Sequence, residues 1–132
     1  MISSRTQTNT LDKATRRHIC LLVAEWCAQN LGTSYRGVPK IRVIKSQSPN
    51  YYGAYNAHKS RHEIVIYYDV CTNVRKLIAT LIHEWTHSLQ KVRKSYSKLY
   101  QEFGDDNHPM EIEARFSEKL WSSCWKEIKC KI

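Results

Sequence analysis

The sequence lacks the segments that would place the chain in a membrane or direct it to secretion. No run of about 18 apolar residues occurs, so a transmembrane helix is excluded. The first ten residues are polar and contain no apolar h-region, so we expect no signal peptide and a mature protein that begins where the sequence does. Internal repeats and low-complexity segments are also missing. These absences predict an intracellular protein without a membrane span.

Cysteine spacings typical of metal or redox motifs are missing as well. The chain has 5 cysteines, an odd number, and no C-x-x-C motif. We therefore expect small buried or half-buried thiols instead of a disulfide framework. A reducing compartment fits these thiols better than secretion does.

Positive charge is in excess but is not concentrated in one run. The 21 Lys and Arg residues against 12 Asp and Glu residues give a formal net charge of +9. Such a field favours anionic partners, including nucleic acid, acidic proteins and membrane surfaces. The basic residues are scattered through every segment, with modest clusters at 16–17, 91–98 and 126–131. Solvated surface is the simpler interpretation of this pattern.

Length and periodicity predict one α+β domain covering residues 1–132, with residues 1–9 flexible. The 42% apolar and 25% charged residues are typical of a soluble globular protein. Thr10 and Thr72 are the expected helix N-caps. The strands are expected to form a small, mostly antiparallel sheet, in which the last two make a hairpin and the third lies inside. The predicted elements are helices at 10–32, 72–91 and 109–126 and strands at 40–45, 51–55 and 63–68.

The helix expected at 72–91 carries an H-E-x-x-H motif. His83 and His87 are four residues apart, so they project from one face of a helix, and Glu84 lies beside them. Two imidazole nitrogens can bind one Zn²⁺ while Glu84 reaches the water on the open position of the metal. The three residues border an apolar stripe and should therefore face a cleft; the stripe consists of Val74, Leu77, Ile78, Leu81, Ile82, Trp85 and Leu89.

A catalytic zinc site needs a third protein ligand, and the usual downstream histidine is absent. Gln90 and Arg93 occupy the positions that an H-E-x-x-H-x-x-G-x-x-H motif would fill with Gly and His. The next ligands are Glu111 and Glu113, at the start of the last helix. The apolar stripe of that helix points somewhat closer to Glu113; it consists of Met110, Ala114, Leu120, Trp121 and Cys124. Either glutamate alone is also explained as an acid stabilised by the helix dipole.

The two segments together resemble the gluzincin metallopeptidases, in which a second helix brings a glutamate to an H-E-x-x-H helix. The pattern T-L-I-H-E-W-T-H followed by H-P-x-E-I-x-A-R is similar to small zincin-like proteins of phages, plasmids and bacteria, over residues 50–120. This resemblance implies a zincin-like fold, one Zn²⁺ held by both motif histidines and Glu111, and a source in a virus or mobile element. Arg115 departs from the family pattern, because such families often carry Asn or Asp there to orient a histidine.

The predicted function is that of a zinc metalloendopeptidase, which hydrolyses a peptide or protein substrate through a metal-bound water. Glu84 would act as the general base. A peptide could pair with the strand at 51–55, because strand addition aligns a peptide without requiring its sequence. The oxyanion of the tetrahedral intermediate needs a hydrogen-bond donor besides zinc, and the sequence does not rank the candidates. They are His108, Tyr51, Tyr52, Tyr55, Tyr96 and Tyr100.

Two alternatives remain open at this point. The net charge of +9 is compatible with a nucleic-acid-associated protein, either an SprT-like protease acting on DNA-bound proteins, which the chain also resembles, or a basic binding module with structural zinc. The other alternative is a zincin scaffold kept for protein binding or regulation. A structural zinc normally has four protein ligands, and the sequence supplies three strong candidates, which favours catalysis.

Overall fold

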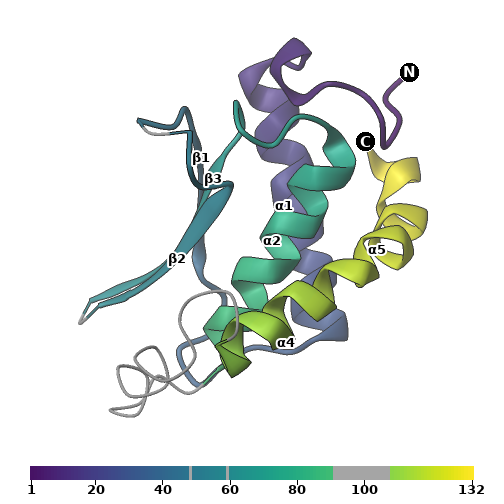
Figure 1. The fold of residues 1–132 in the computed structure, drawn as a ribbon. Coiled ribbons are helices and arrows are strands. Elements are labelled where there is room, and N and C mark those ends of the chain that lie inside the picture. The colour runs from purple at the N-terminus through teal and green to yellow at the C-terminus, as the bar shows by residue number, and fades with distance from the viewer. Residues whose placement is uncertain (48, 59, 91–107) are drawn as a thin grey trace.

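The computed structural model of the protein describes residues 1–47, 49–58, 60–90 and 108–132 (Figure 1). They form an α+β fold with a small sheet, which confirms the predicted class. None of the helices in these ranges is both long and apolar enough to cross a membrane. The elements are η1 (Thr8–Thr10), α1 (Lys13–Asn30), β1 (Lys40–Ile44), β2 (Gly53–His58), β3 (Arg61–Tyr67), α2 (Val74–Leu89), α4 (Pro109–Ser117), η2 (Glu118–Leu120), α5 (Trp121–Ile128) and η3 (Lys129–Lys131).

The sheet has the strand order β1-β3-β2, so β3 is central. β2 and β3 pair antiparallel, as the predicted hairpin requires, whereas β1 pairs parallel to β3. The sheet is therefore mixed, and the expectation of mostly antiparallel pairing is wrong. Three successive residues of β3, Ile64, Val65 and Ile66, are all buried, as in strands covered on both faces, and β3 has a strand on each side. β2 forms one edge of the sheet among the described residues.

Both long helices begin at N-caps other than the predicted ones. The carboxylate of Asp12 accepts a hydrogen bond at 2.7 Å from the backbone N–H three residues on, and the side chain of Asn73 does the same at 2.8 Å. Thr10 instead lies in η1, and Thr72 precedes the cap of α2. Asp and Asn cap helices at least as well as Thr, so the backbone geometry decides which oxygen meets the free N–H group.

The N-terminal segment is hydrogen-bonded to the start of α2. The carbonyl oxygens of Ser4 and Thr6 accept hydrogen bonds from the backbone N–H groups of Arg75 and Val74, at 2.8 and 3.0 Å. The first N–H groups of a helix have no partner within the helix, so these contacts satisfy two of them. Residues 1–9, which the sequence predicts to be flexible, thus include a backbone partner for α2.

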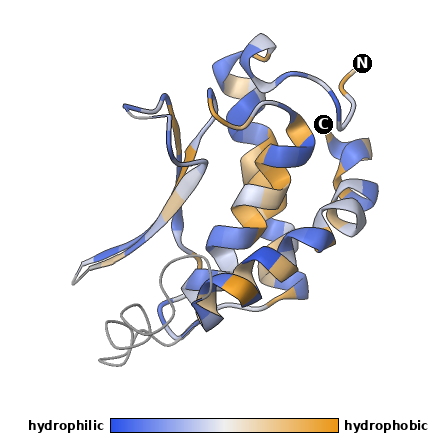
Figure 2. Ribbon diagram, viewed as in Figure 1, coloured by the Kyte–Doolittle hydropathy of each residue, from blue (hydrophilic) through white to orange (hydrophobic). Residues whose placement is uncertain are grey.

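Helix α2 lies between the sheet and the C-terminal helices and also packs against α1 (Figure 1). Figure 2 shows apolar residues concentrated along it. Trp85 is fully buried and donates a 2.9 Å hydrogen bond from its indole nitrogen to the carbonyl oxygen of Gly32, just beyond α1. Burial of each large apolar side chain contributes roughly 1.5–3 kcal/mol. The other fully or nearly fully buried apolar residues of the predicted stripe are Val74, Leu77, Ile78, Leu81 and Ile82.

The last helical segment is divided, so the prediction of one helix over 109–126 is wrong. α4 ends at Ser117, the 3-10 turn η2 follows, and α5 begins at Trp121 (Figure 1). A 3-10 helix has about three residues per turn, so the apolar face shifts between α4 and α5. Ala114 and Cys124 are both buried, but Leu120, which the periodicity assigned to the same stripe, is 37% exposed. The sequence pattern treated residues 109–126 as one regular helix and ignored this shift, which explains why the apolar stripe pointed closer to Glu113.

The cysteines are free thiols, as expected. Four of the five are buried and Cys130 is exposed. Burial raises the pKa of the Cys20 thiol to about 12. The same effect raises the pKa of Cys71 to about 11. Such thiols stay protonated near neutral pH and serve as small packing groups in the core.

Candidate metal centre

His83, Glu84 and His87 come together on the face of α2 that borders the core. One ligand atom from each residue can be chosen so that all lie within 4.8 Å of one another. The two imidazole rings have centroids 4.9 Å apart and are inclined at 73°. Residues four apart on a helix lie on one face, so this part of the geometry is local. The structure therefore contains a His-Glu-His group within metal-binding distance.

Glu111 reaches both imidazole rings from α4. Its Oε1 atom lies 2.7 Å from Nε2 of His83, and its Oε2 atom lies 3.1 Å from Nε2 of His87. The start of α4 is fixed by Pro109 in its first turn and by the side chain of His108, which accepts a hydrogen bond from a backbone N–H in that turn. The position of this first turn places the carboxylate of Glu111 opposite both Nε2 atoms.

Glu113 points in another direction. Its side chain is exposed, and its Oε1 atom accepts a 3.1 Å hydrogen bond from Nε2 of Gln90. Residues two apart on a helix lie about 200° apart around its axis, so the two glutamates cannot face the same neighbour. The structure thus brings Glu111 and not Glu113 to the histidines.

Two side chains that sequence reasoning did not assign to the site bind the other ring nitrogens. Nδ1 of His83 lies 2.8 Å from Oε2 of Glu118, and Nδ1 of His87 lies 2.7 Å from Oε1 of Gln90. Both partners are acceptors, so each Nδ1 carries a proton, and Nε2 is the ring nitrogen that would meet a metal ion. The only sequence signal for Glu118 is its position seven residues after Glu111, two helical turns along the same face.

Arg115 is the residue at which the sequence departs from the pattern of the families that it resembles. Its exposed side chain lines the same cavity as the histidines. The acceptor for His83 comes instead from Glu118, one turn further along the chain. A carboxylate therefore does hold the histidine ring here, but from a different position than the family pattern implies.

The electrostatics of the cluster favour a positive charge at the ring nitrogens. Burial opposes the charged form of His83, but hydrogen bonds to Glu111 and Glu118 outweigh it and raise the pKa of His83 to about 9. The pKa of His87 is also raised, against the effect of burial, by hydrogen bonds to Glu111 and Gln90. Hydrogen bonds from both rings hold the pKa of Glu111 well below its ordinary value. A proton or a metal ion at the Nε2 atoms satisfies this arrangement.

Glu84 has a different environment from the other carboxylates. The residue is 8% exposed, and no hydrogen-bond donor reaches its carboxylate among the described residues. Burial raises the pKa of Glu84, although the neighbouring His83 and His87 partly offset the effect. A carboxylate with a raised pKa can both accept and return a proton near neutral pH.

The group opens into a cavity of about 580 Å³, whose opposite wall includes Tyr51, Tyr52 and Gly53. Gly53 begins β2 where the strand passes close to α2. A Cβ atom on Gly53 would lie 2.7 Å from the carbonyl oxygen of Val65 and 3.0 Å from Cγ2 of Thr80. Glycine is therefore needed at this position, where β2 lies close to both β3 and α2.

The structure shows which of the residues predicted as oxyanion donors line the cavity. Tyr51 and Tyr52 line the cavity. The hydroxyl of Tyr55 is hydrogen-bonded at 2.8 Å to a histidine ring of β3, and His108 is 1% exposed and caps α4. The basic cluster predicted at 91–98 lies outside the described residues, as do the last two candidates, Tyr96 and Tyr100.

The cluster combines the partly buried imidazoles of His83 and His87 with two carboxylates. That of Glu84 is buried beside the rings, and that of Glu111 contacts both of them. Because acceptors bind both Nδ1 atoms, the Nε2 atoms are the ring nitrogens that can bind a metal ion in place of a proton. The arrangement can hold a cation next to a carboxylate that is free to exchange protons. Comparison of the chain with protein-family models, curated proteins and solved structures finds no match.

Proposed function

We propose that the protein is a zincin-like zinc metallopeptidase, in which His83, His87 and Glu111 hold one Zn²⁺ and Glu84 is the general base. The observation that carries this proposal is the convergence of two imidazole Nε2 atoms and one carboxylate, at 2.7 and 3.1 Å, while separate acceptors bind both Nδ1 atoms. Two nitrogens and one oxygen are a ligand set of catalytic zinc sites.

The ligand atoms fit such an ion with small adjustments. Zinc bonds of about 2.0–2.1 Å in a tetrahedral site separate neighbouring ligand atoms by roughly 3.3 Å. The distances from Glu111 to Nε2 of His83 and His87, 2.7 and 3.1 Å, are slightly shorter. Small rotations of these partly exposed side chains would open the site to that spacing. Three protein ligands would leave a fourth position for water or substrate.

When bound, zinc would lower the pKa of a water molecule and polarise the carbonyl of a peptide bond. The remaining chemistry belongs to Glu84, whose buried carboxylate oxygen would accept a proton from the attacking water. The water oxygen then bonds to the carbonyl carbon, the C–N bond breaks, and the same proton passes from Glu84 to the leaving amine. The raised pKa of Glu84 supports this double role.

A peptide substrate would be aligned by the edge strand β2. This strand has β3 on one side, and its first residue, Gly53, lines the cavity of the proposed metal site together with Tyr51 and Tyr52. An extended peptide that adds to such an edge forms hydrogen bonds through its main chain. The scissile carbonyl would then lie in the cavity beside Glu84.

The first experiment compares zinc content and peptide hydrolysis in the wild type and in Glu84→Gln. We expect the variant to keep one zinc per chain and to lose at least about 10²-fold in turnover, as is usual when a general base is removed. Glu25→Gln is the matched control, because it makes the same change on an exposed side chain of α1 that does not line the cavity of the site. Unchanged turnover in Glu84→Gln would refute the mechanism.

A nucleic-acid-associated role is the second candidate, motivated by the net charge of +9. It takes two forms, an SprT-like protease acting on DNA-bound proteins and a binding module with structural zinc. Steeply salt-dependent binding to DNA would support it, and absence of binding at low salt would dismiss it. Loss of hydrolysis in Glu84→Gln would separate the protease form from the structural one.

A further inference from the structure

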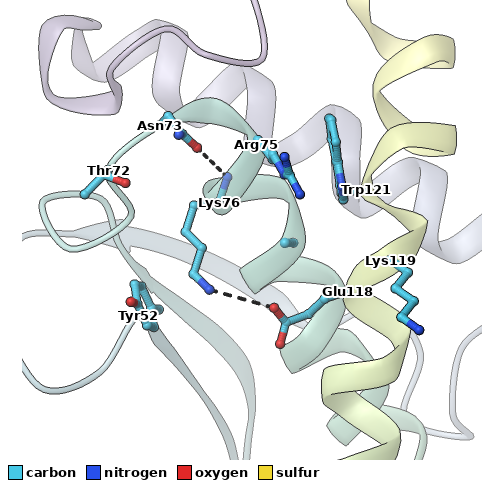
Figure 3. A pocket seen from close by; sticks show the side chains of 9 residues that line it. Tyr52, Thr72, Asn73, Arg75, Lys76, Glu118, Lys119 and Trp121 are labelled. Carbon is cyan, nitrogen blue, oxygen red and sulfur yellow. Dashed lines mark hydrogen bonds and ion pairs between the residues drawn. The ribbon is translucent and has the colours of Figure 1, made fainter.

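A second cavity, of about 490 Å³, lies beside the first part of α2 (Figure 3). We call it the Arg75 pocket. Its walls come from α2, from the chain before β2 and from the segment that joins α4 to α5. Figure 3 shows Arg75 directed toward Trp121, and Lys76 extended between Tyr52 and Glu118. The complete lining is Tyr52, Thr72, Asn73, Arg75, Lys76, Ala79, Glu118, Lys119 and Trp121.

The pocket carries an excess of positive charge. The guanidinium of Arg75 lies over the ring of Trp121, 4.5 Å from its centroid, and no carboxylate pairs with it among the described residues. The single acid of the lining, Glu118, is already hydrogen-bonded to His83 and lies 3.8 Å from the Lys76 ammonium. Arg75 and Lys119 are therefore the cations of this pocket that no carboxylate pairs with in the described part of the chain, and Arg75 is the one that lies over an aromatic ring of the lining.

The side chains, and not the helix backbone, provide the donors of this pocket. The N–H groups of Val74 and Arg75 are occupied by the N-terminal segment, and that of Lys76 by the side chain of Asn73. A guanidinium is planar, and its N–H groups project from its edge as a rigid fork. That geometry matches the two oxygens of a carboxylate.

The Arg75 pocket adjoins the cavity of the proposed metal site. Tyr52, Lys76 and Glu118 line both cavities. Arg75 precedes His83 by eight residues on the same helix, which corresponds to roughly 12 Å along its axis. An extended peptide covers that distance in about three or four residues.

We infer that the Arg75 pocket is a substrate subsite that binds a carboxylate of an extended peptide, three or four residues from the scissile bond. The carboxylate can belong to an Asp or Glu side chain or to the C-terminus of the peptide. This inference rests on the proposed peptidase function, because the spacing of three or four residues is counted from a peptide bond at the proposed metal site.

The test measures peptide binding by fluorescence anisotropy in the zinc-loaded Glu84→Gln protein, so that no cleavage intervenes. The probes are labelled peptides of one sequence in which a single Glu is moved along the chain, the same peptides with Gln, and versions with a free or an amidated C-terminus. We expect Glu at one favoured position to strengthen binding on the order of tenfold over Gln, as for a charge-assisted hydrogen bond in a partly exposed pocket. The free and amidated versions distinguish a side chain from a terminal carboxylate.

Variants at position 75 assign the preference to this pocket. Arg75→Gln should remove it, Arg75→Lys should retain part of it, and Arg75→Glu should favour a peptide with Lys at the same position. Lys126→Gln is the matched control, since it removes one exposed cation of α5 outside the pocket. Equal affinity for Glu and Gln peptides, an unaltered preference in Arg75→Gln, or no peptide binding would overturn the inference.

The two proposals fail in different ways. If the wild type binds acidic peptides through Arg75 but hydrolyses none of them, the subsite stands as a carboxylate-binding site and the peptidase function fails. If the wild type hydrolyses peptides with the same efficiency for Glu and Gln at every position, the peptidase function stands and the subsite is refuted.

Discussion

Replacing Glu118 by Ala removes the acceptor that holds the ring of His83. The contact joins Nδ1 of His83 to Oε2 of Glu118 at 2.8 Å, and the Glu118 side chain is 26% exposed. Loss of such an outer partner typically costs 10–100-fold in metal affinity, which corresponds to about 1.4–2.7 kcal/mol. We expect zinc affinity in Glu118→Ala to fall within this range. The loss should be smaller than in Glu111→Ala, which removes a proposed ligand.

The assay is a competition titration with a chromophoric zinc chelator at fixed pH. Glu118 also lies 3.8 Å from the ammonium of Lys76, but a partly exposed pair at this distance contributes less than about 1 kcal/mol, and to folding and not directly to metal binding. Lys76→Gln therefore serves as a control that removes this pair and the contact of Lys76 with the Tyr52 ring, and leaves the contact between Glu118 and His83 in place. Glu118→Gln keeps an acceptor oxygen and should recover part of the affinity.

The outcome of this titration bears directly on the proposed site. Unchanged zinc affinity in Glu118→Ala, together with normal affinity in Lys76→Gln, would show that the His83 ring is oriented by something other than Glu118. Equal losses in Glu118→Ala and Glu25→Ala would also refute the reasoning, because Glu25 is exposed on α1 and does not line the cavity of the site.

Two further predictions concern packing and pH. Gly53→Ala should destabilise the fold by about 1–3 kcal/mol, measured by denaturant unfolding, because its Cβ would lie 2.7 Å from a backbone oxygen that cannot move aside; unchanged stability would contradict this packing. In the metal-free chain the pKa of His83 is raised to about 9 from an ordinary 6.5, so its protonation stabilises the fold fully below pH 6.5, and this contribution is lost as the pH rises through 9. The same proton competes with zinc, so zinc affinity should increase between pH 6.5 and 9, and a flat profile would contradict it.

The long-range partners of the motif could not be chosen from the sequence. Glu111 and Glu113 differ by two positions on one helix, and the choice between them depends on how α4 docks against α2. The periodic pattern was misleading because the 3-10 turn η2 changes the phase of the apolar face. Glu118 lies in this turn, and its contact with His83 spans 35 residues of sequence.

The sequence by itself determined the features that arise within one element. The 3.6-residue period places His83, Glu84 and His87 together on α2, and the continuous apolar run of β3 makes it the central strand. The tertiary structure alone decided which carboxylate meets the histidines, which acceptors orient their rings, and that β1 runs parallel to β3. It also created the Arg75 pocket, whose walls come from three separate segments. These contacts depend on the relative placement of elements, which local backbone geometry does not specify.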